Sequence, residues 1–287
     1  KTEDLTEIEL SKEEADSDIE ILLGFTEYKK AKEAFHNAPN FYLFFPLSEE
    51  KHKLRFILHS NAFYKSASRT FLQKGSVGEE GINERLFTVF IEKLVERMLL
   101  WANDSDKKEK NKFIELYANL LLSDSSDNPE RVWINEPLYE PILEFIQKNI
   151  PIKDFANNSF QLAVSSHNVL IKNTALPVDS EQWLLGTTNW FYWNKEDDES
   201  IYNEAISTLK LGIQTFSILQ LLQQKDIYHK INKWLDNNDD RINLLVKELN
   251  LQLLDSGENE KTELDNLKDN ISNLNLWKFD NGNYYAI

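Results

Sequence analysis

The feature that most constrains the fold is a long amphipathic stretch from Asn83 to Trp101. Apolar residues recur in it at the i, i+3, i+4, i+7 spacing over four turns, at Leu86, Phe87, Phe90, Ile91, Leu94, Val95, Met98 and Leu99. This spacing predicts a helix with one face against a core, and Asn83 is the expected N-cap. The same spacing over residues 107–122 predicts a second helix.

Runs rich in apolar and aromatic residues precede these helices and predict a sheet. Residues 19–25, 40–45 and 54–59 have the composition of strands, and residues 1–18 that of an edge strand followed by a loop. Residues 28–35 fit either a further strand or one short helix. Several strands followed by long helices indicate a sheet that is laid down early and then covered by helices.

The polar segment 123–130 contains a proline, has no periodicity and predicts a linker, so we place a domain boundary after residue 125. Beyond it, the expected helices are 137–149, 181–185, 200–209, 217–236 and 240–250, the third capped by Ser200. One or two strands are expected over 160–171, a strand over 211–216, and a hairpin around Asn281-Gly282. The fold class is therefore α/β (α+β), with domains 1–125 and 126–287.

Composition restricts the partners and the location. The 287 residues carry a net charge of −16, which lacks the basic footprint of nucleic-acid binding. The chain has no cysteine, as expected of a cytoplasmic protein, and therefore no disulfide or thiolate chemistry. No apolar run approaches the ~18 residues that span a bilayer, so no membrane association is expected. The charged start without Met suggests a fragment of a larger protein.

Most catalytic motifs are missing. The five histidines are scattered without metal-ligand spacing, and we expect no metal site. The acidic pairs and triplets are expected in loops or at helix starts. The chain contains no phosphate-binding glycine motif and no nucleophile elbow, and the glycine-rich segment 75–81 is expected to be a mobile connection. The aromatic group at Trp183 and residues 190–193 fits core packing better than a ligand platform or partner surface.

Arg69 is the remaining candidate. The run Ser66-Ala-Ser68-Arg69-Thr70-Phe71-Leu72-Gln73 follows an expected strand. We expect Ser66 or Ser68 to cap a short helix that begins at Arg69, with Gln73 one turn later on the same face. A cation there opposes the helix dipole, so an ordinary surface arginine is one interpretation. The other is an anion site made of backbone N–H groups and a guanidinium.

Residues 68–73 have the form S-R-x-x-L-Q, which resembles a motif in the middle domain of the ninety-kilodalton heat-shock chaperones of the GHKL ATPase superfamily. Residues 19–100 resemble the corresponding segment of bacterial sacsin-like proteins, with IEILLGF, FYLFFPL and LRFILHSNAFYKSASRTFL in the same order. Residues 207–217 and the NLWKFDNGNYY ending resemble downstream parts of those proteins. The resemblance extends loosely over the whole chain.

The resemblance implies a transducer domain with the ribosomal-protein-S5 domain-2-like fold at 1–125, followed by a helix-rich α/β domain. It implies that Arg69 reaches the γ-phosphate of ATP bound with Mg²⁺ in a preceding domain, with Gln73 assisting and Ser68 beside the nucleotide. The chain has no D-x-G-x-G segment, and we expect no helix whose E-x-x-x-N pattern supplies a metal-binding asparagine. The expectation is thus part of an ATPase that is inactive alone and binds no cofactor by itself.

Two other functions stay open. One is a non-enzymatic scaffold that binds proteins through acidic faces and the tryptophan-rich segment, and the other is a DNA-repair or topoisomerase-type transducer. The net charge argues against the second. A protein client and a homodimeric parent are open partners, and the sequence does not choose between quality control and bacterial defence.

Overall fold

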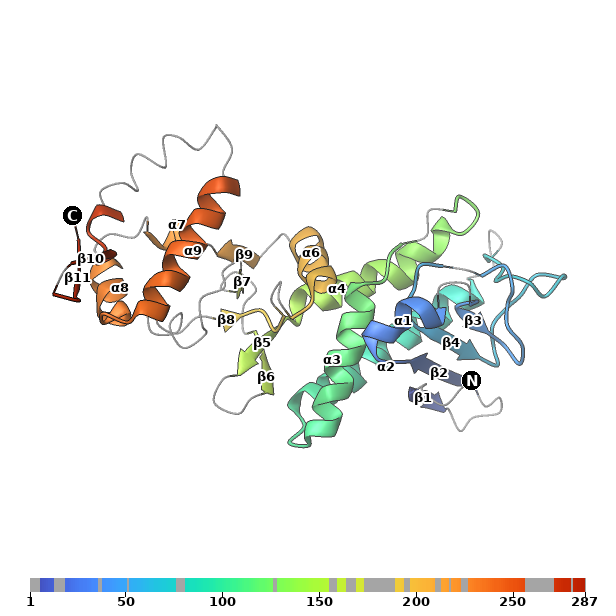
Figure 1. Ribbon diagram of the computed structural model, residues 1–287. Coiled ribbons are helices and arrows are strands. Elements are labelled where there is room, and N and C mark those ends of the chain that lie inside the picture. The colour runs from blue at the N-terminus through green and yellow to red at the C-terminus, as the bar shows by residue number, and fades with distance from the viewer. Residues whose placement is uncertain are drawn as a thin grey trace. The chain divides into compact units, whose positions relative to one another are not determined.

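The structure is a computed structural model of the chain (Figure 1). The chain divides into two compact units. It describes residues 6–12, 19–35, 38–50, 52–75, 81–125, 128–154, 159–163, 169–172, 189–193, 197–209, 213–216, 218–222, 227–255, 271–279 and 281–286. The first unit comprises Lys1–Ser166 and Asp198–Leu211, and the second comprises His167–Asp197 and Gly212–Ile287. Among the described residues, no helix is both long and apolar enough to cross a membrane.

A four-stranded sheet with the order β1-β2-β4-β3 forms the start of the first unit. Its strands are β1 (Thr6–Lys12), β2 (Glu20–Phe25), β3 (Phe41–Tyr42) and β4 (Ile57–Ser60). Neighbouring strands are antiparallel except β3 and β4, which are parallel. The predicted edge strand and the predicted strand 19–25 are confirmed, whereas only two residues of the predicted strand 40–45 pair. Residues 28–35, for which the sequence left a choice, form a helix.

Helices and a second, two-stranded sheet make up the other described elements of this unit. They are α1 (Tyr28–Phe35), α2 (Ile82–Asn103), α3 (Lys107–Leu121), a 3₁₀ turn (Val132–Ile134), a π-helical turn (Asn135–Tyr139), α4 (Glu140–Lys148), β5 (Pro151–Asp154), β6 (Ser159–Leu162) and α6 (Glu199–Thr208). The two long predicted helices are confirmed as α2 and α3. Two predicted caps are wrong. Gly81 precedes α2 in place of Asn83, and Asp198 caps α6 by accepting from the backbone N–H groups of Ser200 and Ile201.

An aromatic cluster joins the sheet to α2. The ring of Phe41 lies 5.6 Å from that of Phe87, and the ring of Phe56 stacks at 6.3 Å on that of Phe90. All four side chains are fully buried. The apolar stripe that predicted α2 therefore does pack on residues of the predicted strands, and this burial is the main source of stability for such a helix.

The predicted linker 123–130 does not separate the units. Ser123 is buried, and its hydroxyl accepts from the N–H of Arg55 at 2.9 Å. The N–H of Asp124 donates to the carbonyl of Lys53 at 3.1 Å. The division into units therefore differs from the predicted domains 1–125 and 126–287, because this polar segment has its hydrogen bonds with residues 53–55 of the first unit.

In the part of the second unit that the structure describes, there are a parallel sheet with the order β8-β7-β9, helices and a terminal hairpin. They are β7 (Val169–Lys172), β8 (Asn189–Trp190), β9 (Ile213–Phe216), α7 (Ile218–Leu222), α8 (Ile227–Leu235), α9 (Asp239–Asp255), β10 (Trp277–Lys278) and β11 (Tyr284–Tyr285). The predicted hairpin is confirmed, with Gly282 at φ 82° in its turn. The predicted helix 181–185 lies outside the described residues.

Core packing is confirmed for three members of the aromatic group, whereas Tyr192 is only half-buried. Trp190 belongs to the hydrophobic cluster of the second unit, and Phe191 and Trp193 are also buried. Trp183 lies outside the described residues. At the level of mixed helices and small sheets, the predicted α/β class is therefore confirmed.

Candidate functional site

Arg69 lies in the turn of a hairpin, not on a helix. Lys65 pairs with Leu72 in an antiparallel bridge, and the N–H of Ser66 donates to the carbonyl of Phe71 at 2.9 Å. Arg69 has φ 61°, in the left-handed region. The predicted helix beginning at Arg69 is wrong, because a residue in that region cannot continue a right-handed helix and the chain turns back to pair with itself.

The hairpin also changes the expected relation of Arg69 to its neighbours. Ser68 is exposed, and its hydroxyl lies 2.9 Å from that of Ser66 and 2.7 Å from that of Thr70. The N–H of Gln73 donates to the carbonyl of Tyr64 at 3.1 Å, which places Gln73 at the base of the hairpin. Arg69 and Gln73 therefore do not share a helical face, whereas Ser68 stays beside Arg69 in the turn.

A buried carboxylate anchors the hairpin to the core. Glu50 has no exposed surface, and its Oε1 accepts from the N–H of Leu72 at 2.6 Å. The neighbouring N–H of Glu49 donates to the carbonyl of Thr70 at 2.9 Å. Both bonds fix backbone groups within three residues of Arg69, so the turn is tied to the core while its tip faces solvent.

Two more side chains complete the environment of Glu50. The Nε2 of His52 lies 2.7 Å from Glu50 Oε2, and the Nε of Arg131 lies 3.3 Å from Glu50 Oε1. The guanidinium of Arg131 also stacks over the ring of Phe71, 4.3 Å from its centroid. A buried carboxylate needs such partners, because an unpaired buried charge is strongly destabilising. Arg131 thus holds both the carboxylate and the hairpin residue next to Leu72.

Asn83 anchors the base of the same hairpin. Its Oδ1 accepts from the N–H of Tyr64 at 2.9 Å, and its Nδ2 donates to the carbonyls of Tyr64 at 2.7 Å and Gln73 at 2.9 Å. The side chain is fully buried in the first turn of α2. Asn83 therefore joins both strands of the hairpin to the helix, in place of the capping role predicted for it.

The guanidinium of Arg69 has no hydrogen-bond or ion-pair partner in the part of the chain that the structure describes, and the residue is exposed. A guanidinium offers donors in a planar fork that suits phosphate and carboxylate oxygens. The site can therefore present one rigidly mounted, unpaired cation to an anion that approaches from outside the unit.

Sequence reasoning missed Glu50, His52 and Arg131 as parts of this site. The His52 side chain had been grouped with scattered histidines, and Arg131 lies just after the segment read as a linker. Their only local signal is the short spacing between Glu50 and His52, which fits many surface patterns. Their association comes from tertiary structure, because Arg131 is distant in sequence from both.

An E-x-x-x-N spacing does occur at Glu115–Asn119 in α3, but these side chains serve the fold. Glu115 accepts from the N–H of Tyr28 at 2.9 Å, and Asn119 donates to the carbonyl of Thr26 at 2.7 Å. Burial raises the pKa of Glu115, partly offset by the hydrogen bond from Tyr28. The pair holds the connection from β2 to α1, and a metal-binding role has no support here.

No group of three or more His, Asp or Glu side chains able to hold a metal ion occurs among the described residues. Comparison with protein-family models gives no match to the chain, and comparison with curated proteins gives none either. The functional assignment therefore depends on the sequence motif and on the geometry of the hairpin.

Proposed function

We propose that this chain is the middle, transducer-type segment of a chaperone-like GHKL ATPase, and that Arg69 senses the γ-phosphate of ATP bound with Mg²⁺ by a domain outside these residues. Closure of that domain onto the hairpin would bring the phosphate to Arg69, and the first unit would pass the closure on to later parts of the protein or to a client. The S-R-x-x-L-Q resemblance at residues 68–73 supplies the class.

The observation that carries the proposal is the way the hairpin holds Arg69. The residue has φ 61° and no partner among the described residues, while Glu50 and Asn83 anchor the backbone on both sides of it. Left-handed backbone costs about 1–2 kcal/mol for a residue with a Cβ. An arginine kept in this conformation, exposed and unpaired, fits a role in binding an external anion.

The specific fold of the transducer domain is part of the same proposal. A four-stranded sheet followed by two long helices is compatible with a ribosomal-protein-S5 domain-2-like transducer. The role of Gln73 is narrower than the motif implies, because Gln73 lies at the base of the hairpin and not beside Arg69. Gln73 is proposed to assist only by supporting the hairpin, through the bond between its carbonyl and Asn83.

The experiment is ATP turnover by the parent protein, in which this chain follows its ATP-binding domain. An arginine that stabilises transition-state charge is worth ~10³–10⁵ in rate, so Arg69→Ala should lower turnover by at least about 10³-fold. Arg97→Ala is the matched control, since Arg97 is an exposed arginine about 21 Å further along α2 than Asn83 at 1.5 Å per residue. Equal turnover in the two variants would exclude a catalytic contribution from Arg69.

The scaffold alternative loses part of its basis and keeps the acidic faces. Trp190 and Trp193, which were to bind a partner, are buried in the fold. The DNA-repair or topoisomerase alternative keeps only the superfamily likeness, against a net charge of −16. No observation favours either one.

A further inference from the structure

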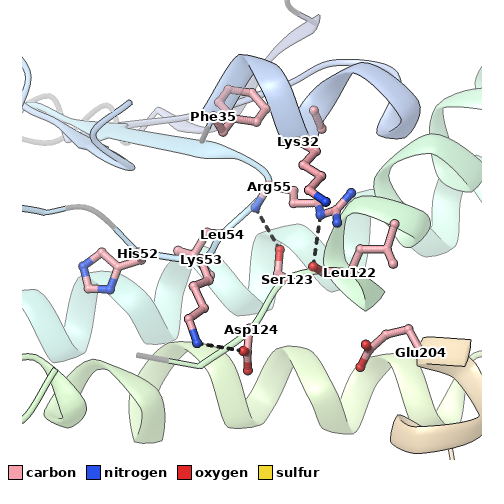
Figure 2. Close-up of a pocket in the computed structure, with 11 residues that line it drawn as sticks. Lys32, Phe35, His52, Lys53, Leu54, Arg55, Leu122, Ser123, Asp124 and Glu204 are labelled. Carbon is pink, nitrogen blue, oxygen red and sulfur yellow. Dashed lines mark hydrogen bonds and ion pairs between the residues drawn. The ribbon is translucent and has the colours of Figure 1, made fainter. Parts of the chain in front are cut away.

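A cavity of about 560 Å³ lies in the first unit, apart from the turn that carries Arg69 (Figure 2). Its walls come from α1, from residues 52–55, from residues 122–124 and from α6. Cavities of roughly 300–1,000 Å³ are the usual size of small-molecule sites. The volume therefore exceeds what a single inorganic ion would fill.

The charges on the cavity wall differ in sign from those of the whole chain. Lys32, Lys53 and Arg55 line the cavity, against two carboxylates, Asp124 and Glu204. Counting these lysine, arginine and carboxylate side chains, the wall is net positive in a chain whose net charge is −16. Such a local reversal attracts small anions, because the field inside a low-dielectric cleft is focused.

Two of these cations have charged donor groups without a partner among the described residues. Lys53 pairs with Asp124 at 3.2 Å. The guanidinium of Arg55 donates only through Nε, to the carbonyl of Leu122 at 3.1 Å, so both terminal amino groups lack a partner in the described part of the chain. Lys32 also has no hydrogen-bond or ion-pair partner among the described residues. Figure 2 shows Lys32 extending from α1 into the region of the Arg55 guanidinium.

The partial burial of Arg55 also favours an anionic ligand. Desolvation lowers the pKa of Arg55, and the charges of Asp198 and Glu204 partly oppose that shift. An arginine stays protonated in proteins, so a half-buried guanidinium with two free amino groups gains from a charge-assisted bond. An anion would supply that bond.

Much of the remaining wall is apolar, although His52 and Ser123 also line it. Ala31, Phe35, Leu54 and Leu122 line the cavity beside the cations. Apolar surface favours an organic body attached to the anionic group, because burying apolar atoms away from water stabilises binding. The ligand chemistry is thus an anionic head with an apolar portion.

We propose that this cavity binds a small organic anion whose phosphate or carboxylate group is held by Arg55 and Lys32 and whose apolar portion packs against Phe35. The carboxylate of Glu204 on α6 repels a ligand's negative charge, so the anionic group is expected to lie near Arg55 and away from Glu204. This site is independent of the function proposed for Arg69.

The test is calorimetric titration of the 287-residue chain at low salt with phenyl phosphate and, separately, benzoate. Binding of one probe identifies the head group as phosphate or carboxylate. Lys32→Met should weaken binding about tenfold, as expected for loss of a charge-assisted contact. Lys29→Met is the matched control, because Lys29 is also exposed on α1 and the substitution changes the net charge equally, and it should leave binding unchanged.

A further pair of variants tests whether the anion binds in this cavity. Arg55→Gln should abolish binding, and Glu204→Gln should tighten it because a carboxylate facing the anion is removed. Circular dichroism checks that Arg55→Gln is folded, and Lys32→Met carries the test if it is not. The proposal is overturned if neither probe binds, if Lys29→Met and Lys32→Met weaken binding equally, or if Glu204→Gln leaves it unchanged.

Discussion

Among single residues, Arg69 in the hairpin turn and Glu50, which anchors that hairpin, have opposite environments. Arg69 is exposed in strained backbone and has no partner among the described residues, whereas Glu50 is fully buried and contacts Leu72, His52 and Arg131. The buried carboxylate of Glu50 is bonded to its neighbours, whereas the exposed guanidinium of Arg69 can bind an external anion. The proposed function needs both, because a sensing cation is useful only on a support that does not move.

Glu50→Gln should lower the free energy of unfolding by about 3 kcal/mol, because the buried guanidinium of Arg131 would lose its nearest carboxylate. The carboxylates of Glu49 and Glu130 are exposed and lie further away, at 3.9 and 4.0 Å, so they compensate only weakly. Glu49→Gln removes an equal charge one residue earlier, where the side chain is largely exposed, and should leave stability nearly unchanged. Urea denaturation of both variants measures the difference. Equal stabilities would mean that the Glu50 cluster does not hold the hairpin.

Position 69 offers a separate test of backbone strain. Arg69→Gly and Arg69→Ala both remove the guanidinium, but only glycine adopts φ 61° without steric cost. Arg69→Gly should therefore be more stable than Arg69→Ala by about 1 kcal/mol. Thermal unfolding of the two variants gives the comparison, and an alanine variant as stable as the glycine variant would contradict the strained turn.

Individual elements were predictable to different degrees. The apolar stripes of α2 and α3 have a period that only a helix satisfies, and both helices occur where expected. The Asn281-Gly282 turn was equally clear, because Gly282 needs a positive φ. The run 66–73 was misread because serines near a cation suit both a capped helix and a tight hairpin, and a tertiary contact with Glu50 decides between them.

Asn83 connects two of these elements, and its substitution tests how the hairpin is mounted on α2. Asn83→Ala removes three hydrogen bonds to backbone groups of Tyr64 and Gln73 and should cost about 2–3 kcal/mol in unfolding free energy. Asn103→Ala is the control on the same helix, since the Asn103 side chain is exposed and, among the described residues, bonds to the carbonyl of Leu99 alone. Hydrogen exchange at Tyr64 should also rise in Asn83→Ala, and equal exchange in both variants would contradict this role.

At the scale of the whole molecule, the sequence predicted a mixed α/β fold but not how the chain divides. A polar, proline-containing segment looked like a linker, yet Ser123 and Asp124 bond to residues 53–55. The first unit also includes residues 198–211, which follow part of the second unit in the chain. Local composition does not show that a later segment packs against an earlier unit, because this depends on contacts between residues far apart in the chain.

The same limit applies to the candidate site. Arg69 could be selected from its motif, whereas the residues that hold it are separated along the chain and carry no motif. The charged cavity at Arg55 was not anticipated either, since Lys32, Arg55 and Glu204 are brought together only by the packing of α1 and α6 around residues 52–55.

The most direct measurement of the central claim is nucleotide affinity in the parent protein, with and without the guanidinium of Arg69. Arg69→Ala should weaken binding of a non-hydrolysable ATP analogue at least about tenfold, because a charge-assisted bond to the γ-phosphate is lost, and should leave ADP binding unchanged. Arg97→Ala should alter neither. If Arg69→Ala leaves the affinity for the ATP analogue unchanged, or weakens ADP binding equally, Arg69 does not sense the γ-phosphate.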